Sequence, residues 1–577
     1  MRIATIAAWV VASAFFVTGS SIREAAAQQP NNPLGNDVCL GCHGQEGFAM
    51  PRADRQMRAL YVDKEKFDAS VHGKDVPCVG CHQNITEIPH QNVAKTTLEW
   101  RQGIANLCGA CHTDARDQYL TSVHAKQLMQ NGNLGAPTCS NCHTAHAVAA
   151  AGSDENRNAI TQQCGGCHAQ NLRSFLDTYH GKVHTLGYAY AAKCFDCHAE
   201  HAIQRVSDPA STVHPNNRLQ TCQRCHLNAT AGFVTFQPHA TAHDFARYPQ
   251  VWIASKFMIA LLGGTFAFFW THSALWYYRE YKDREQLKAR PHVQTDGLLH
   301  EQDPYYQRWT AMWRIAHLAF ATCIIILLIT GMSLLYADSL WAPLVQKAFG
   351  GPQVTGTVHR TFALCFVAIF FAHLAYVVVR IGRNWRTFKW FGPYSLIPNL
   401  QDLKDAVGMF KWFFGIGPRP MFDRYTYWEK FDYWAPFWGV TIIGVSGAIL
   451  WFKEVAAKFL PGWAFNVATI FHGEEAFLAA GFLFTVHFFN NHWRPEKFPL
   501  DVQMFTGAMP LEEFKRDHMV EYNRLVETGR LKNYLVDKPS RPLTLGSKIL
   551  GFVLMAFGLM ILTAILIGFG RSLMEGR

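Results

Sequence analysis

Hydrophobic residues are arranged in two very different ways along the 577-residue chain. After Pro249, long apolar runs with aromatic ends recur at about 252–278, 311–336, 355–381, 431–452, 465–490 and 547–570. Each run approaches the ~20 apolar residues that cross a bilayer as a helix. Before residue 250 long apolar runs are few. The pattern predicts an all-α protein: a loop-rich domain at 28–250 and a bundle of six transmembrane helices at 251–577.

The first 27 residues form a separate pattern, with a short basic start, an apolar run and a small-residue end at Ala25–Ala27. This is typical of a secretory signal peptide, and the run is short for a membrane anchor. We therefore expect residues 28–250 to be exported.

Charge adds an orientation to the predicted helices. Basic residues concentrate in the linkers 279–310, 382–430 and 491–546, whereas 337–354 and 453–464 carry few. The positive-inside rule places the three basic linkers in the cytoplasm and residues 28–250 in the periplasm of a bacterial inner-membrane protein. The formal charge of +10 then reports topology, and nucleic-acid binding is not expected.

Fourteen of the 16 cysteines fall into seven C-x-x-C-H motifs, the attachment motif of c-type haem. The paired thiols are Cys39 and Cys42, Cys78 and Cys81, Cys108 and Cys111, Cys139 and Cys142, Cys164 and Cys167, Cys194 and Cys197, and Cys222 and Cys225. Each motif ends in an iron-ligating histidine: His43, His82, His112, His143, His168, His198 and His226. Seven repeats in an exported segment predict seven covalent haems, whose faces supply most of this domain's core.

Ten other histidines precede residue 250, enough for a second axial ligand on every iron. Those best placed are His72, His124 and His180, in similar phrases before a motif, and His146 and His201, in C-H-x-x-H; His214 and His243 follow. His90, His184 and His239 have weaker support. Bis-histidine haems exchange electrons and bind no substrate, so the segment is expected to conduct electrons.

Histidines also recur inside the predicted helices, where ionisable groups are usually functional. His359 and His373 are 14 residues apart on one helix, and His472 and His487 are 15 apart on another. These spacings give two levels, about 21–22 Å apart, on nearly one face. Two non-covalent b haems are predicted: an outer one between His359 and His472, and an inner one between His487 and either His317 or His373.

Residues 305–505 resemble the membrane cytochrome b subunits of formate dehydrogenases and nickel–iron hydrogenases. The resemblance rests on "RIAH" at 314–317, "VHR" at 358–360 and "FHGEEAFLA" from Phe471. It implies two b haems and quinone exchange, and favours His317 opposite His487. Tyr433 stands where such a helix often has histidine. The whole chain resembles the cytochrome c/cytochrome b fusion quinol oxidoreductases of metal-reducing bacteria.

Quinol oxidation also needs a proton acceptor. Glu475, three residues after His472, is the candidate catalytic residue. The expected function is a quinol dehydrogenase that passes electrons from menaquinol through the b haems to the c haems and on to other periplasmic or outer-membrane c-type cytochromes. The reverse flow into the quinone pool, and a terminal reductase of nitrite, hydroxylamine or sulfur oxyanions, stay open as alternatives.

Overall fold

A computed structural model describes residues 34–51, 57–90, 96–289 and 304–574, so the predicted signal peptide lies outside the described residues. The chain divides into two compact units, 1–150 and 151–577. Composition places the boundary near residue 250 instead. The difference arises because residues 151–248 pack against one end of the membrane helices and form one unit with them.

Short helices and loops make up the first unit. Its elements are α1 (Asn36–His43), α2 (Lys64–Asp68), α3 (Cys78–Cys81), α4 (Thr97–Gly109), α5 (Thr113–Thr121), α6 (Val123–Met129), α7 (Cys139–His143) and the antiparallel strands β1 (Ala49–Pro51) and β2 (Met57–Ala59). A capping box between Thr96 and Glu99 starts α4. One cluster of buried apolar side chains is small and contains Ala105, Tyr119 and Ala125. The apolar core around this cluster is therefore small.

The second unit begins with similar short elements and continues into long helices. The short ones are α8 (Asp154–Cys167), α9 (Ala169–Leu176), α10 (Tyr179–Thr185), α11 (Cys194–His198), α12 (Arg218–Gln223) and η1 (Phe233–Thr235). The long ones are α13 (Pro249–Ala289), α14 (Ala311–Leu335), α16 (Pro352–Arg383), α18 (Tyr427–Trp451), α20 (Trp463–Phe482) and α24 (Arg541–Met574). Two π-helical turns, η2 (Leu483–His487) and η3 (Phe489–Trp493), prolong α20.

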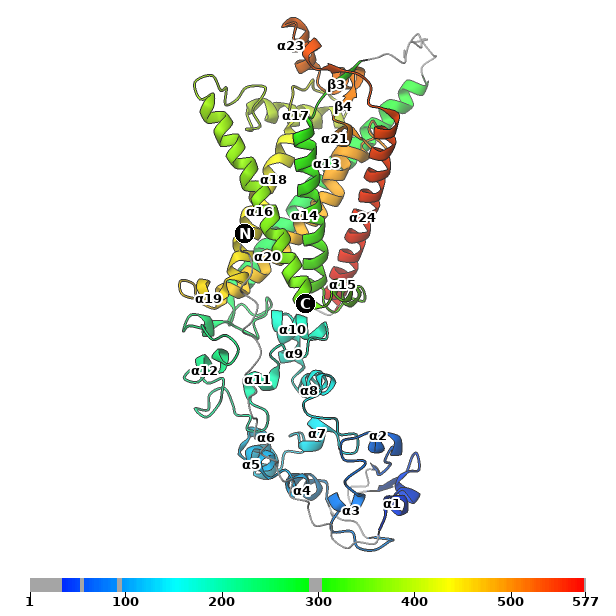
Figure 1. Ribbon diagram of the computed structural model, residues 1–577, viewed down its shortest axis with the longest axis vertical. Helices are drawn as coiled ribbons and strands as arrows, with labels where there is room; N and C mark the ends of the chain where they lie inside the picture. The colour runs from blue at the N-terminus through cyan, green and yellow to red at the C-terminus, as the bar shows by residue number, and fades with distance from the viewer. Residues whose placement is uncertain (1–33, 52–56, 91–95, 290–303, 575–577) are drawn as a thin grey trace, which may run out of the picture. The chain divides into compact units, whose positions relative to one another are not determined.

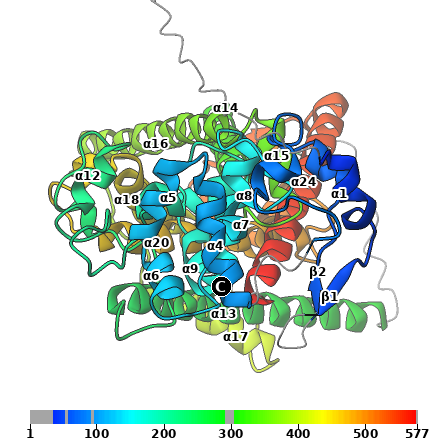
Figure 2. The ribbon, with the colours of Figure 1, turned by 90° about the horizontal axis from the view of Figure 1, so that it is seen from below.

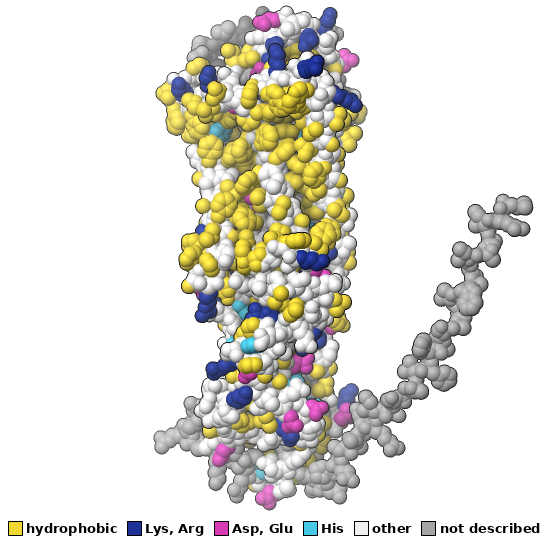
Figure 3. Space-filling view, turned by 90° about the vertical axis from the view of Figure 1, so that its left-hand side faces the viewer, with side chains coloured by type: hydrophobic (Ala, Val, Ile, Leu, Met, Phe, Trp, Pro, Cys, Tyr) yellow, Lys and Arg dark blue, Asp and Glu magenta, His cyan; other side chains and the backbone are white. Residues whose placement is uncertain are grey.

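The six long helices coincide with the six predicted apolar runs, and each is long and apolar enough to cross a membrane. α14 packs along α16, and α18 packs along α20, while α13 and α24 contact α20 from its other sides (Figure 1). Seen end-on, α13 and α16 lie at opposite edges of the bundle (Figure 2). On the face that Figure 3 shows, hydrophobic side chains form a broad band across the bundle.

The two ends of the bundle carry different structures. One end has α15 (Ala342–Ala348) and α19 (Lys453–Ala456). The other has α17 (Leu400–Phe413), α21 (Gln503–Thr506), α22 (Leu511–Asp517), α23 (Met519–Glu527), η4 (Leu531–Asn533) and a sheet in the order β4 (Ala508–Pro510), β3 (Tyr305–Gln307), β5 (Leu535–Val536). The all-α prediction did not include these short strands. Lys and Arg side chains gather at this second end, which we call the basic end (Figure 3).

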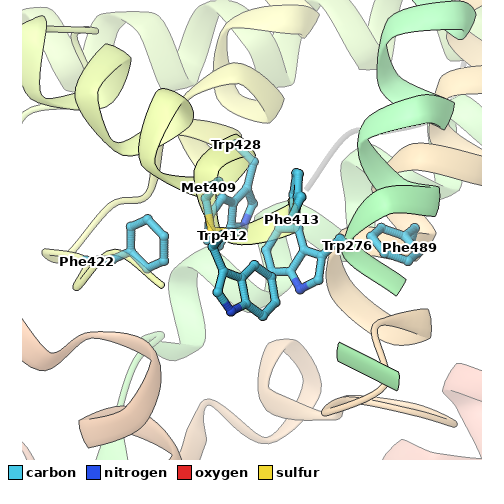
Figure 4. Close-up of a cluster of buried hydrophobic side chains, with 7 residues drawn as sticks. All are labelled: Trp276, Met409, Trp412, Phe413, Phe422, Trp428 and Phe489. Atoms are coloured by element: carbon cyan, nitrogen blue, oxygen red, sulfur yellow. The ribbon is translucent and has the colours of Figure 1, made fainter. Parts of the chain in front are cut away.

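An aromatic cluster anchors the basic end. It consists of Trp276, Met409, Trp412, Phe413, Phe422, Trp428 and Phe489 (Figure 4). The guanidinium of Arg494 lies 4.9 Å from the centre of the Trp276 ring, and that of Arg419 lies 5.6 Å from it. Four members of the cluster, Met409, Trp412, Phe413 and Phe422, come from the linker between α16 and α18. This linker therefore folds back onto the helices and fixes their spacing at this end.

Candidate functional site

Five motif histidines each face a second histidine from another part of the chain. The ring centres are 6.1 Å apart for His43 and His90, 6.1 Å for His112 and His72, 6.5 Å for His82 and His146, 6.4 Å for His198 and His239, and 6.1 Å for His226 and His180. A bond of about 2 Å from each nitrogen to iron, plus about 1.1 Å from nitrogen to ring centre, puts two axial imidazoles about 6.2 Å apart. The pairs therefore fit haem iron.

Burial also suits these rings to metal binding, which requires neutral imidazole. It lowers the pKa of His180 to about 4, with the neighbouring His226 and Lys453 acting in the same direction. Burial likewise lowers the pKa values of His82, His146 and His198.

Some of the candidate second ligands face a motif histidine and others do not. His72, His146 and His180 face motif histidines, and so do His90 and His239, which the sequence pattern ranked lower. His146 follows His143 by three residues but faces His82, so closeness in sequence does not identify the partner. In the described part of the chain, His214 and His243 make no ring contact with a motif histidine. His124 lies in α6 and His201 lies just after α11.

Within the bundle, His359 of α16 and His472 of α20 form a sixth pair, with ring centres 6.2 Å apart. The Nδ1 of His359 bonds to the Thr330 hydroxyl at 2.9 Å, and the Nδ1 of His472 bonds to the Ile443 carbonyl oxygen at 3.0 Å. Because each Nδ1 is engaged, Nε2 is the nitrogen available to iron on both rings. This pair fits the predicted outer b haem.

Glycines on the adjacent helices make room for these two rings. A Cβ at Gly331 of α14 would lie 3.1 Å from Cε1 of His359, and one at Gly447 of α18 would lie 3.0 Å from Cε1 of His472. Each glycine follows a hydroxyl residue that bonds to its histidine: Thr330 at 2.9 Å, Ser446 at 3.3 Å. Sequence reasoning missed this hydroxyl–glycine pair, although its repetition is visible as "TG" and "SG".

The same repetition relates the two helix pairs. Gly331 lies 14 residues after His317, and Gly447 lies 14 residues after Tyr433. The second members, α16 and α20 with its extension η2, each carry two histidines. His472 and His487 are 15 residues apart, one more than His359 and His373. The additional residue coincides with the π-helical turn η2, which accommodates one more residue per turn than an α-helix. The pairs α14–α16 and α18–α20 thus follow one pattern, in which Tyr433 occupies the position of His317.

At the inner level, His487 lies near His317, whereas His373 bonds to Tyr433. His487 lies within electrostatic range of His317, and its Nδ1 is 3.3 Å from the carboxylate of Asp432. His373 is engaged elsewhere: its Nε2 is 3.0 Å from the Tyr433 hydroxyl. That separation leaves no room for an iron, which needs about 2 Å on each side. The contacts favour His317 over His373 as the partner of His487.

Glu475 is almost fully buried, with 3% of its surface exposed, one turn from His472. Its Oε1 lies near Gly439 of α18, while its Oε2 has no hydrogen-bond partner among the described residues. Buried carboxyl oxygens are normally hydrogen-bonded, so this atom is a suitable acceptor for a bound hydroxyl. Glu474 lies within electrostatic range of Tyr336, the residue that follows α14.

The end of the bundle nearest His359 and His472 holds the last motif of the chain. Phe233 lies 4.9 Å from the His226 ring and 5.9 Å from Phe465 of α20, measured between ring centres. Gln237 and Asn466 bond to each other twice, at 3.2 and 2.9 Å, and Lys182 donates to the carbonyl of Leu335. The His226–His180 pair is thereby fixed beside the membrane helices. We call this contact region the junction.

Six membrane-length helices with two histidines facing each other between two of them fit a multi-pass membrane cytochrome b domain. Comparison with known families agrees: residues 235–391 match the family model of prokaryotic cytochrome b561, which binds haem b and transfers electrons across membranes. The matched range includes His317, His359 and His373 and ends before α18. No curated protein and no solved structure matches the chain.

Proposed function

We propose that the chain is a quinol dehydrogenase of the bacterial inner membrane. It would pass electrons from menaquinol through two b haems to seven periplasmic c haems, and onward to soluble or outer-membrane c-type cytochromes. Haem supplies one-electron redox chemistry when bound. The chain's own residues ligate the irons, hold them in sequence and accept the quinol protons.

The junction is the observation that carries this proposal. A route from quinol to the c segment requires a c-haem site beside the outer b-haem site. Phe233 contacts both the His226 ring and Phe465, and Phe465 belongs to α20, the helix that bears His472. The bonds between Gln237 and Asn466 hold the two segments in contact.

Complete bis-histidine ligation favours electron transfer over a terminal reductase, which needs an open iron face. Five motif histidines already face a second histidine. For the other two, His143 and His168, we propose His124 and His201 as the second ligands.

Glu475 is proposed as the proton acceptor for quinol oxidised at the outer level. Its unpartnered Oε2 can accept a hydrogen bond from a quinol hydroxyl and then its proton. Release would follow toward the periplasmic side, if the basic end is cytoplasmic as the positive-inside rule predicts.

The test is stopped-flow reduction of the purified protein by a menaquinol analogue, recording b and c absorption bands separately. We expect the b bands to be reduced first and the c bands after them. Glu475→Gln should slow b reduction at unchanged haem content, whereas the control Glu474→Gln should not. Absence of any quinol-dependent reduction in the unaltered protein would end the proposal; normal rates in Glu475→Gln would remove only the role of Glu475.

A further inference from the structure

The two levels of the bundle differ in what holds the outward nitrogen of the histidine from α20 and its extension η2, which is His472 at the outer level and His487 at the inner level. At the outer level both partners are neutral. The Thr330 hydroxyl donates its own hydrogen to the carbonyl of Ile326 at 2.7 Å and therefore accepts from His359, and His472 donates to a backbone carbonyl. Arg360, which acts electrostatically on His359, is a cation.

At the inner level the partner is an anion. The Nδ1 of His487 is 3.3 Å from Oδ2 of Asp432, and an ionised carboxylate can only accept, so the histidine donates. The amide nitrogen of Asn491 lies equally near Nδ1 and donates to the His487 carbonyl at 2.9 Å, but it cannot accept a hydrogen bond, so the acceptor for the Nδ1 hydrogen is Asp432. The second oxygen of Asp432 is buried and has no hydrogen-bond partner among the described residues.

Other groups around His487 do not supply a comparable charge. α14 contributes His317, and the following turn contributes His492. From α13, Trp270 donates to Thr485, two residues away, and Gly558 of α24 faces Phe484. Arg494, at the basic end, lies 3.6 Å from Glu496. Position 316, which corresponds to Asp432 in the other helix pair, is alanine. The carboxylate of Asp432 therefore distinguishes His487 at the inner level from the two histidines of the outer level.

We infer that Asp432 is a positioning residue that makes the inner haem the lower-potential one. A carboxylate on the outward nitrogen fixes the ring and makes the imidazole a stronger electron donor, which favours ferric iron. A neutral partner has less of this effect. The inference rests on the proposed use of the bundle as an electron carrier, and it adds a direction between the two levels: an electron that reaches the inner haem returns downhill to the outer haem, the level at which Glu475 would meet quinol, and goes on to the junction.

The test is a redox titration of the full-length protein with chemical mediators, following the b bands and the low-spin signals of electron paramagnetic resonance. His317→Ala identifies which b component is the inner one. We expect that component to have the lower midpoint potential in the unaltered protein. In Asp432→Asn it should move to higher potential with altered g values, while the outer component stays unchanged. Asp432→Glu should restore the original potential.

Asp405→Asn is the matched control, because it removes a carboxylate from α17 that bonds to Gln401 and not to a histidine. An unchanged titration in Asp432→Asn, or an equal shift in Asp405→Asn, would overturn the inference. If Asp432→Asn loses the inner haem, the inference is tested by the order of the two potentials in the unaltered protein. An inner haem of higher potential than the outer one would overturn the inference. Mediators replace quinol, so the result is independent of whether quinol is oxidised.

Discussion

His359 and His472, 113 residues apart in sequence, face each other across the bundle with their ring centres 6.2 Å apart. Neither ring is held by its own helix. α14 positions the first through Thr330, and α18 positions the second through Ile443. Four helices thus contribute to one iron site, so changes on the two supporting helices are expected to affect haem content.

Gly447→Val should remove or loosen the outer b haem. The first carbon of the new side chain would lie 3.0 Å from Cε1 of His472 and force the ring from its position. Gly444→Val is the control, since no atom lies within 4 Å of a Cβ at that position of the same helix. Haem b per c haem, measured by the pyridine haemochrome spectrum, should fall only in Gly447→Val.

His317→Ala and His373→Ala should differ in haem content. His317→Ala should lose the inner b haem, whereas His373→Ala should retain both, because His373 bonds to Tyr433. The same spectrum measures this. Loss of haem in His373→Ala alone would reverse the assignment.

His239→Ala should convert one c haem to high spin without detaching it. Thioether bonds from Cys194 and Cys197 would still hold the proposed haem, whereas an iron bound by His198 would lose its second ligand, since the ring centres of His198 and His239 are 6.4 Å apart. His243→Ala, which removes a histidine without such a contact, should leave every c haem low-spin. Magnetic circular dichroism distinguishes the two states. Equal spectra for the two variants would contradict the pairing.

Gly462→Ala should weaken the junction. A Cβ there would lie 1.9 Å from the backbone nitrogen of Phe236, so the two backbones would have to separate. Overpacking of this kind costs about 1–3 kcal/mol. We expect a lower melting temperature and slower electron transfer from b to c, measured by stopped flow. Gly263→Ala, in open space on α13, should change neither.

Acid should loosen the basic end through Asp517. Burial opposes ionisation of this carboxyl, but the bond from Arg516 and the charges of Lys497 and Arg494 outweigh it and hold its pKa well below the usual range. A depressed pKa stabilises the fold above the unfolded value of about 3.9, and this contribution is lost as pH falls below it. Hydrogen exchange of α22 and α23 should therefore accelerate on acidification.

Asp517→Asn should reproduce that acceleration at neutral pH, with a loss of about 2 kcal/mol for a hydrogen bond to a charged group. Its exchange should respond less to acid than that of the unaltered protein. An unchanged rate at pH 7 would show that Asp517 contributes little to this end of the molecule.

The sequence by itself determined the six membrane helices, because their apolar runs are continuous and have the length that a bilayer requires. It also determined the seven C-x-x-C-H motifs and two levels of histidines in the long helices, since both are local patterns with fixed spacing. The outer pair, His359 and His472, needed only helix geometry to be predicted.

Tertiary structure alone decided the partners. His90 and His239 face motif histidines despite weak local patterns, and His146 faces His82 although another motif is nearer in sequence. Which rings meet depends on loop paths that no short-range periodicity encodes. At the inner level the difference between His317 and His373 depends on the Tyr433 hydroxyl, and the environment of His487 depends on Asp432. Both are contacts between helices, and helix packing brings them together only in the folded bundle.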